Sequence, residues 1–389
     1  MPDLTDTART TPATRNKYDL QELAGAFGDL GTLIPFVVAY ISIVKMDPGG
    51  ILLAFGTALI AVGLLYKTPF PVQPMKAIGA VAITQSIGAV TLTPLMVAGA
   101  GVVTAAMWLF LAATGLARWI AKWVPRSALL GVVMGLGFTF MLEGIRMMAG
   151  SWPVATVLLA GTLLVMSRSK PAAMMLLLAV GVGIALLGRP ELMGALSLVK
   201  PAFQLPAFTW PALGGQDLWL GMLLLALPQL PLTFGNAFVA ITEENNRLFP
   251  DRPVTTRQVA YSTGFLNLWS SALGGIPMCH GAGGMAGHVK FGARTGGSSV
   301  MLGILLTGLA LFFARSVDTL FLLFPPAVLG VILFIAGTEL ALRSRDPQAE
   351  KEDRFVVIAT AAFAVLHVGV AVLFGVAAHV ASKRGWLKF

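Results

Sequence analysis

Polar side chains and helix-starting prolines gather in two short stretches of this sequence, each between long apolar runs. The first reads PFPVQPMKAIGA and contains Gln73, Pro74 and Lys76. Closely spaced prolines interrupt a spanning helix, whereas proline is well tolerated in the first turn of a helix. We therefore expect an extended lead-in followed by a helix that begins near Pro74, inside the membrane. The free backbone N–H groups of such a helix start, together with the Lys76 ammonium, would bind an anion.

A second stretch, GGIPMCHGAGGM, has the same pattern. Aligning Pro277 with Pro71 aligns Cys279 with Gln73, and the glycines after His280 would let an anion approach the backbone closely. Tight helix packing is the alternative explanation of these glycines. Interrupted segments at corresponding places in two halves are the best sequence indication of a transporter binding site. The candidate ligands in the two stretches are Gln73, Pro74, Met75, Lys76, Cys279, His280, Gly281, Ala282, Gly283 and Gly284.

Two further apolar segments, AFGDLGTLIP and LPQLPLTFGN, carry glycines or prolines that would break a helix. Their polar candidates are Asp29, Thr32, Gln229, Thr233 and Asn236. A carboxylate in the middle of a membrane needs a partner and most often has a function. We expect Asp29 to couple transport to a proton or cation, or to organise the site through Lys76, because a bare carboxylate would repel an anion. The hydroxyls and amides would contact the oxygens of an oxyanion, and hydrogen bonding between helices is the alternative.

Cys279 and His280 together suggest nucleophilic chemistry as a different class of function. We consider an enzyme the weakest interpretation, because no third group in the sequence is placed to orient the histidine. The one cysteine and four histidines offer no disulfide within the chain and no metal-ligand spacing, so we expect no cofactor and no metal. We expect His288 and Lys290, further along the second helix, to face the cytoplasm.

The composition shows that membrane helices must position these residues. Of the 389 residues, 56% are hydrophobic and only 12% are charged, and the mean hydropathy is +0.81. A soluble domain carries about 25% charged residues. The net charge of +9 comes from bases in short loops, which is typical of one face of a membrane rather than of nucleic-acid binding. The protein is therefore an all-α polytopic membrane protein whose partner is the lipid bilayer and not a nucleic acid.

Hydropathy predicts fourteen spans, seven in each half. An odd number of spans per half forces the halves into opposite orientations, which makes an inverted repeat typical of secondary transporters. Spans three (74–90) and ten (280–291) would be half-helices, and the last two spans are short enough to be one. The expected divisions are an N-terminal cytoplasmic tail at 1–19, a first repeat at 20–187, a linker at 188–216, a second repeat at 217–382 and a C-terminal tail at 383–389.

Four motifs together resemble the molybdate transporter family, which is distantly related to the SulP sulfate permeases. They read GDLGTLIPF, PVQPMKAIGAVA, LPQLPLTFGNA and GGIPMCHGAGGMAGHVKFGARTGG. The resemblance covers nearly the whole membrane region and implies the seven-plus-seven inverted repeat of sulfate and uracil permeases. Spans one to four and eight to eleven would form a core domain, the other spans a gate domain, and the substrate would lie between the starts of spans three and ten. It also suggests a homodimer and no cytoplasmic regulatory domain after the last span.

The residues and the resemblance together predict a transporter that imports molybdate across a bacterial-type inner membrane or an organellar one. An elevator-like motion of the core against the gate would give alternating access. Two helix starts and Lys76 would roughly balance a dianion, and the membrane potential opposes its import, so we expect coupling, with protons as the first choice. Tungstate or sulfate as substrates, and an anion channel on the same fold, stay open, because oxyanions of this shape differ mainly in size.

Overall fold

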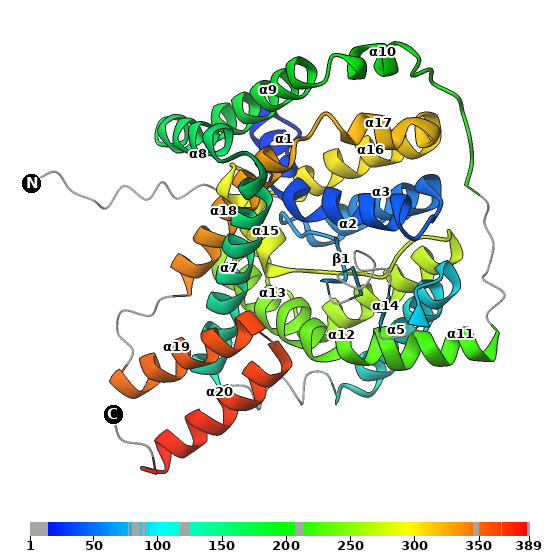
Figure 1. Cartoon of the computed structure of the whole chain (residues 1–389). Helices are drawn as coiled ribbons and strands as arrows, with labels where there is room; N and C mark the ends of the chain where they lie inside the picture. Colours follow the sequence, from blue (N-terminus) through cyan, green and yellow to red (C-terminus); the bar gives the residue numbers. More distant parts are fainter. Residues whose placement is uncertain are drawn as a thin grey trace, which may run out of the picture.

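The computed structural model describes residues 15–76, 78–79, 86–87, 90–116, 125–206, 214–344, 350–366 and 368–386. These residues form helices and two short strand pairs (Figure 1). The first half contains α1 (Leu20–Ala26), η1 (Phe27–Asp29), α2 (Leu30–Ser42), α3 (Pro48–Tyr66), β1 (Gln73–Pro74), β2 (Ser86–Ile87), β3 (Val90–Thr91), α5 (Pro94–Thr114), α7 (Arg126–Met148), η2 (Ala149–Ser151), α8 (Trp152–Met166) and α9 (Lys170–Gly188). The rest contains α10 (Glu191–Ser197), α11 (Gly215–Leu220), η3 (Gly221–Ala226), α12 (Leu227–Leu232), η4 (Thr233–Ala240), α13 (Ile241–Leu248), α14 (Thr256–Ala272), β4 (Met278–Cys279), α15 (Ala282–Lys290), α16 (Gly297–Phe312), η5 (Ala314–Ser316), α17 (Val317–Phe321), α18 (Pro326–Arg343), α19 (Lys351–Leu366) and α20 (Val368–Lys383).

Five described helical stretches are long and apolar enough to cross a membrane. They are Leu20–Ser42, Pro48–Tyr66, Pro94–Thr114, Arg126–Met166 and Lys170–Gly188. A bent pair, Gly297–Phe312 with Ala314–Phe321, raises the number to six. The stretch at 126–166 joins α7 to α8 and so contains two of the expected spans. Several spans are thus present in the described residues, and the number fourteen stays a prediction.

The first and eighth expected spans change helix type where the sequence predicted breaks. A single 3-10 turn, η1, connects α1 to α2 and ends at Asp29. In the eighth span the helix is continuous from Gly215 to Leu248 and widens to a π-helix in η3 and η4, before and after α12. The prediction that Pro228 and Pro231 break this span is wrong. A membrane helix accommodates prolines by such local widening, which gives the freed backbone groups new partners.

The segment expected as span three, 74–90, does not form one helix. Pro74 lies in β1, helical backbone begins at Lys76, and residues 80–85 lie outside the described part of the chain. The end of the segment pairs as antiparallel strands, β2 with β3. β-branched residues such as Val90 favour this extended backbone over a helix.

Two other features differ from the prediction, and one open alternative is decided. The linker at 188–216 contains a helix, α10. Hydropathy places the start of the expected twelfth span at Leu320, but its long helix α18 begins at Pro326 and the shorter helix α17 precedes it, because successive prolines interrupt a helix. The last two spans are not one long helix, since α19 and α20 pack against each other and both pack against α7.

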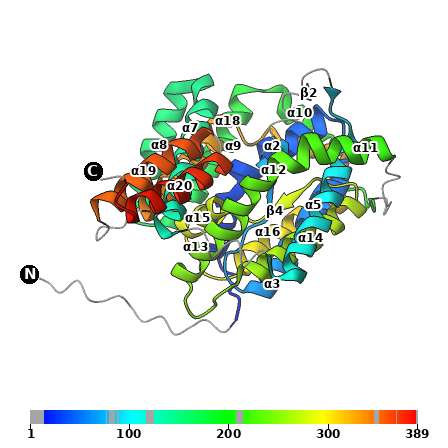
Figure 2. The ribbon, with the colours of Figure 1, turned by 90° about the horizontal axis from the view of Figure 1, so that it is seen from below.

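The helices form two groups with α15 between them. In one group α3 packs against α16 and α5 against α14, and in the other α7 packs against α18, α19 and α20. Figures 1 and 2 both show α19 and α20 on one side of α15, and α3, α5 and α14 on the other. Small residues let the backbones approach closely. A β-carbon on Gly337 of α18, for example, would lie only 2.6 Å from the Gly137 carbonyl oxygen of α7.

Candidate functional site

The two interrupted stretches lie against each other in the interior. β1 pairs antiparallel with β4, so that Gln73 lies opposite Cys279 and Pro74 opposite Met278. Asn267 of α14 binds β4 through both groups of its amide. Its amide nitrogen donates to the Met278 carbonyl at 2.7 Å, and its amide oxygen accepts from the Met278 N–H at 3.1 Å. The pairing thus brings together two segments from different halves of the chain.

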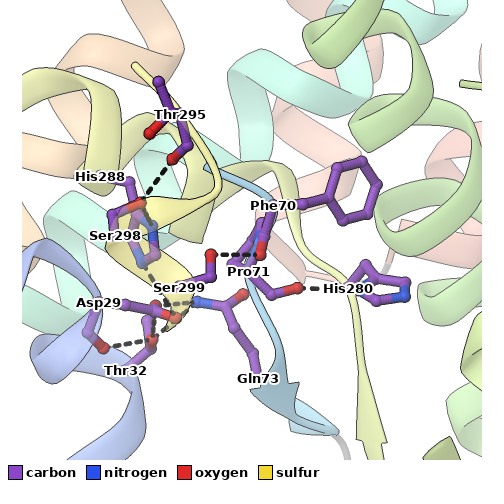
Figure 3. A network of polar contacts seen from close by, with 10 residues as sticks. All are labelled: Asp29, Thr32, Phe70, Pro71, Gln73, His280, His288, Thr295, Ser298 and Ser299. Atoms are coloured by element: carbon purple, nitrogen blue, oxygen red, sulfur yellow. Dashed lines mark hydrogen bonds and ion pairs between the residues drawn. The ribbon is translucent and has the colours of Figure 1, made fainter. Parts of the chain in front are cut away.

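His280 connects the second stretch to the first and to α14. Its Nδ1 donates to the Pro71 carbonyl at 2.8 Å, and its Nε2 lies 2.7 Å from the Ser262 hydroxyl. The buried ring packs edge-on against Phe70. Figure 3 shows the imidazole on the Pro71 side of the network. Because both ring nitrogens already have partners, the His280 side chain positions the backbone and does not act as a base for Cys279.

Asp29 is bound by Thr32 and Gln73 (Figure 3). Gln73 Nε2 donates to Asp29 Oδ1 at 2.5 Å and to Thr32 Oγ1 at 2.7 Å, and the Thr32 hydroxyl lies 2.5 Å from the same Oδ1. The second carboxylate oxygen, Oδ2, has no hydrogen-bond partner and lies 3.9 Å from Nε2 of His288. Asp29 therefore orients the Gln73 amide directly, and it forms no hydrogen bond with Lys76, whose Nζ has none.

His288 is buried, which contradicts the expectation that it faces the cytoplasm. Its Nδ1 lies 3.5 Å from the Ser298 hydroxyl, and α15 is packed by α18, α1 and η1. Lys290, also expected to face the cytoplasm, pairs with Glu339 of α18 at 2.5 Å and is only 22% exposed. A histidine in a glycine-rich helix was the sequence signal that drew attention to this position. The sequence did not show which way the His288 side chain points, because it does not reveal that other helices cover α15.

The first turn of α15 is enclosed by side chains from other elements. A β-carbon on Gly281 would collide with Oε1 of Gln73, and a β-carbon on Gly283 would collide with the ring of Phe140 from α7. A side chain at either position would have to displace Gln73 or Phe140, and glycine leaves room for these close neighbours. The helix begins at Ala282, after Gly281, rather than at His280 as predicted.

The three polar residues of the eighth span have different positions. Asn236 of η4 reaches α15, where its amide oxygen accepts from the Ala282 N–H at 3.3 Å. Gln229 donates to the Thr233 hydroxyl at 2.9 Å, one turn along the same helix. Asn236 thus contacts the candidate site directly, whereas Gln229 and Thr233 pair with each other.

Lys76 brings a positive charge to this place. The residue is partly exposed, but its Nζ atom is buried without a hydrogen-bond partner and lies 3.7 Å from the centroid of the Phe140 ring. A buried charge without an acceptor is unfavourable, and an aromatic ring compensates only part of its lost hydration. Lys76 and the start of α15 therefore contact the same ring. Together they offer an anion one full charge and the partial charge of a helix N-terminus.

Open cavities lie elsewhere in the molecule. One of about 610 Å³ is lined by residues of α2, α9 and α18, among others, and one of about 750 Å³ is lined by residues that include Tyr66, Lys67 and Arg252. Neither of these two cavities is lined by a described residue of β1, β4 or α15. Among the described residues no group of three or more His, Cys, Asp or Glu side chains could hold a metal ion.

Comparison with known proteins identifies the family. The family described as "Molybdate transporter of MFS superfamily" matches residues 21–140 and 221–340. Molybdate transporter 2 of Arabidopsis thaliana is 32% identical over 404 residues, which cover 91% of this chain and 85% of the relative. Molybdate transporter 1 of the same plant is 29% identical and covers 87% and 82%, and molybdate transporter 1 of Chlamydomonas reinhardtii is 28% identical and covers 89% and 88%.

Solved structures show the same fold. The transmembrane domain of the cyanobacterial bicarbonate transporter BicA matches with a TM-score of 0.56 and 17% identity over 91% of this chain and 96% of that one. The murine anion transporter Slc26a9, in an inward-facing state, matches with a TM-score of 0.61 and 15% identity over 96% and 70%. The family's description names the MFS superfamily, but the solved structures that share this fold are anion transporters. The chain therefore belongs to the molybdate transporter family, and it is an integral membrane anion transporter rather than an enzyme.

Proposed function

We propose that this protein is a secondary active transporter that imports molybdate. The observation that carries the proposal is the pairing of β1 with β4, which brings the Lys76 ammonium and the glycine-rich start of α15 to one place. Molybdate as the substrate is supported by the family match and by the names of the relatives. Tungstate has the same shape and charge and is the expected competitor.

The proposed site holds the oxyanion by charge and by neutral donors. Lys76 supplies a charge, the N-terminus of α15 supplies its partial positive charge and backbone N–H groups other than those of Ala282 and Gly284, which already have acceptors, and side-chain amides contact the remaining oxygens. The proposed substrate-binding residues are Thr32, Gln73, Pro74, Met75, Lys76, Gln229, Thr233, Asn236, Cys279, His280, Gly281, Ala282, Gly283 and Gly284. Backbone groups rather than side chains act at His280, since its ring nitrogens are bound elsewhere.

The proposed transport movement is an elevator-type displacement of one helix group against the other. The core would contain α3, α5, α14 and α16 with the paired strands and α15, and the gate would contain α7, α18, α19 and α20. The separate packing of the two groups supports this division. The two matched segments of the family, one in each half, support the repeats at 20–187 and 217–382. A homodimer, a bacterial inner membrane and a cytoplasmic N-terminus belong to the same proposal.

Asp29 is the proposed coupling group. Import of a dianion against a negative interior costs about 2.3 kcal/mol per charge per 100 mV, so protons carried inward would offset this. Oδ2 of Asp29 is buried without a hydrogen bond, which leaves a position for a proton. We expect Asp29→Asn to abolish the acceleration of uptake by an inward proton gradient, while exchange of molybdate across the membrane continues. Uptake by this variant that still responds to the gradient would assign coupling to another group.

Radiolabelled molybdate uptake into proteoliposomes tests the function. Saturable uptake that unlabelled tungstate suppresses is expected of a molybdate carrier, and a tenfold excess of sulfate should leave most of the uptake. Equal competition by sulfate would contradict the molybdate assignment. A conductance that does not saturate would indicate a channel on the same fold.

A further inference from the structure

Phe140 lies where the proposed anion site needs space. It is an apolar residue within an apolar span, so nothing in the sequence distinguished it from its neighbours. Its ring is buried, and it contacts the two positively polarised groups of the site, the Lys76 ammonium and the first turn of α15 at Gly283. A Cα–Cβ bond tilts toward the N-terminus of its helix, so the ring that a Gly283 β-carbon would meet lies at the N-terminal end of α15.

The position of this ring is set by the other helix group. Phe140 belongs to α7, and α7 packs closely on α18, where a β-carbon on Gly337 would lie 2.8 Å from Cβ of Phe140. The Lys76 and Gly283 backbones belong to the paired stretches that β1 and β4 hold together. A relative movement of the two groups therefore moves the ring away from Lys76 and α15, whereas side-chain rotation alone has little free space in a packed interior.

We propose that Phe140 and the transported oxyanion compete for the same place, so that the ring occupies the site in the empty protein and leaves when the anion binds. The inference rests on the proposed function and adds a residue that sets its affinity. The ring gives the buried Lys76 ammonium a cation–π partner in the absence of an anion. An oxyanion replaces this contact with a stronger charge-assisted hydrogen bond.

The competition predicts that a smaller side chain at position 140 tightens anion binding. Phe140→Ala removes both the ring's volume and its contact with Lys76, so molybdate should bind the detergent-solubilised protein about tenfold more tightly, measured by isothermal titration calorimetry. Phe140→Leu keeps most of the volume and loses the π face, so a smaller tightening is expected. Phe138→Ala is the matched control, because Phe138 lies on the same helix and is 42% exposed. Unchanged or weaker binding in both Phe140 variants would overturn the inference.

A second measurement tests the ring without any anion. Phe140 shields the Lys76 amine, so Phe140→Ala and Phe140→Leu should increase the labelling of Lys76 by a water-soluble amine reagent, read by peptide mass spectrometry, and Phe138→Ala should not. Equal labelling in all variants that retain the wild-type elution profile and melting temperature would refute the inference even if no anion binds. A different outcome would reject the proposed substrate but not the position of the ring. In that outcome, the wild type binds neither molybdate nor tungstate, yet Lys76 labelling still increases in the Phe140 variants.

Discussion

The two interrupted stretches have similar sequences but use their polar side chains differently. In the first, Oε1 of Gln73 and Nζ of Lys76 are buried without hydrogen-bond partners. In the second, both ring nitrogens of His280 are bonded, and the Met278 backbone is held on both its N–H and its carbonyl by one asparagine. The first stretch therefore keeps two buried polar atoms without hydrogen-bond partners, whereas the His280 ring and the Met278 backbone of the second stretch are fully hydrogen-bonded.

This difference suggests separate roles: the first stretch binds the anion, and the second holds the backbone in place. A buried polar group without a partner is destabilising, and native proteins keep few such groups. We infer that the first stretch keeps them because an oxyanion completes their bonding during transport. The second stretch supplies a fixed backbone and the helix start, and its side chains hold that backbone in place. Substitutions in the first stretch should therefore affect affinity, and those in the second should affect stability.

The largest expected effect is that of Lys76→Ala. Lys76 is the proposed charged ligand of the dianion, so its loss should weaken molybdate binding about a hundredfold, because hydrogen bonds to charged groups contribute up to about 3 kcal/mol. Titration calorimetry and the KM of uptake measure this. Lys45→Ala is the matched control, since Lys45 is an exposed lysine in the loop before α3. Equal effects of the two substitutions would remove Lys76 from the site.

The next effect is that of His280→Ala, and it should appear mainly in stability. The substitution leaves the buried Pro71 carbonyl without this partner, which costs about 1–3 kcal/mol. The Ser262 hydroxyl keeps its hydrogen bonds with Tyr66 and the Val259 carbonyl. A lower melting temperature is expected, together with a change in molybdate affinity much smaller than that of Lys76→Ala. A large loss of affinity at an unchanged melting temperature would show that the imidazole contacts the anion, and the comparison between the stretches would fail.

The smallest effect is expected for Cys279→Ser. The thiol is buried, unpaired with another cysteine and opposite Gln73 in the strand pair, and the transport mechanism needs no nucleophile. Uptake should stay within about twofold of the wild type, because the replacement keeps the shape and exchanges the thiol for a hydroxyl, whose net contribution to hydrogen bonding is small. Cys279→Ala distinguishes a polarity effect from a thiol effect. Abolished uptake in both variants would restore a role for the thiol.

Local signals in the sequence marked the membrane class and the stretches of the candidate site. Hydropathy shows the membrane class, and prolines and glycines mark the two stretches because their backbone limits act within a few residues. The intramembrane Asp29 was identified by its charge alone. The same local rules failed in the eighth span, where a continuous helix absorbs Pro228 and Pro231 by widening, since the surrounding helices supply alternatives that the sequence does not show.

The sequence by itself determined that this chain crosses a membrane, that two segments interrupt its helices and that Lys76 and the glycines after His280 stand at those interruptions. Only the tertiary structure decided that β1 pairs with β4, that Asp29 binds Gln73 and Thr32, that His288 is buried beside Asp29 and that Phe140 covers Lys76. The physical reason is that a membrane helix is apolar both where it meets lipid and where it meets other helices. Its sequence then carries no periodic signal for which face meets which neighbour.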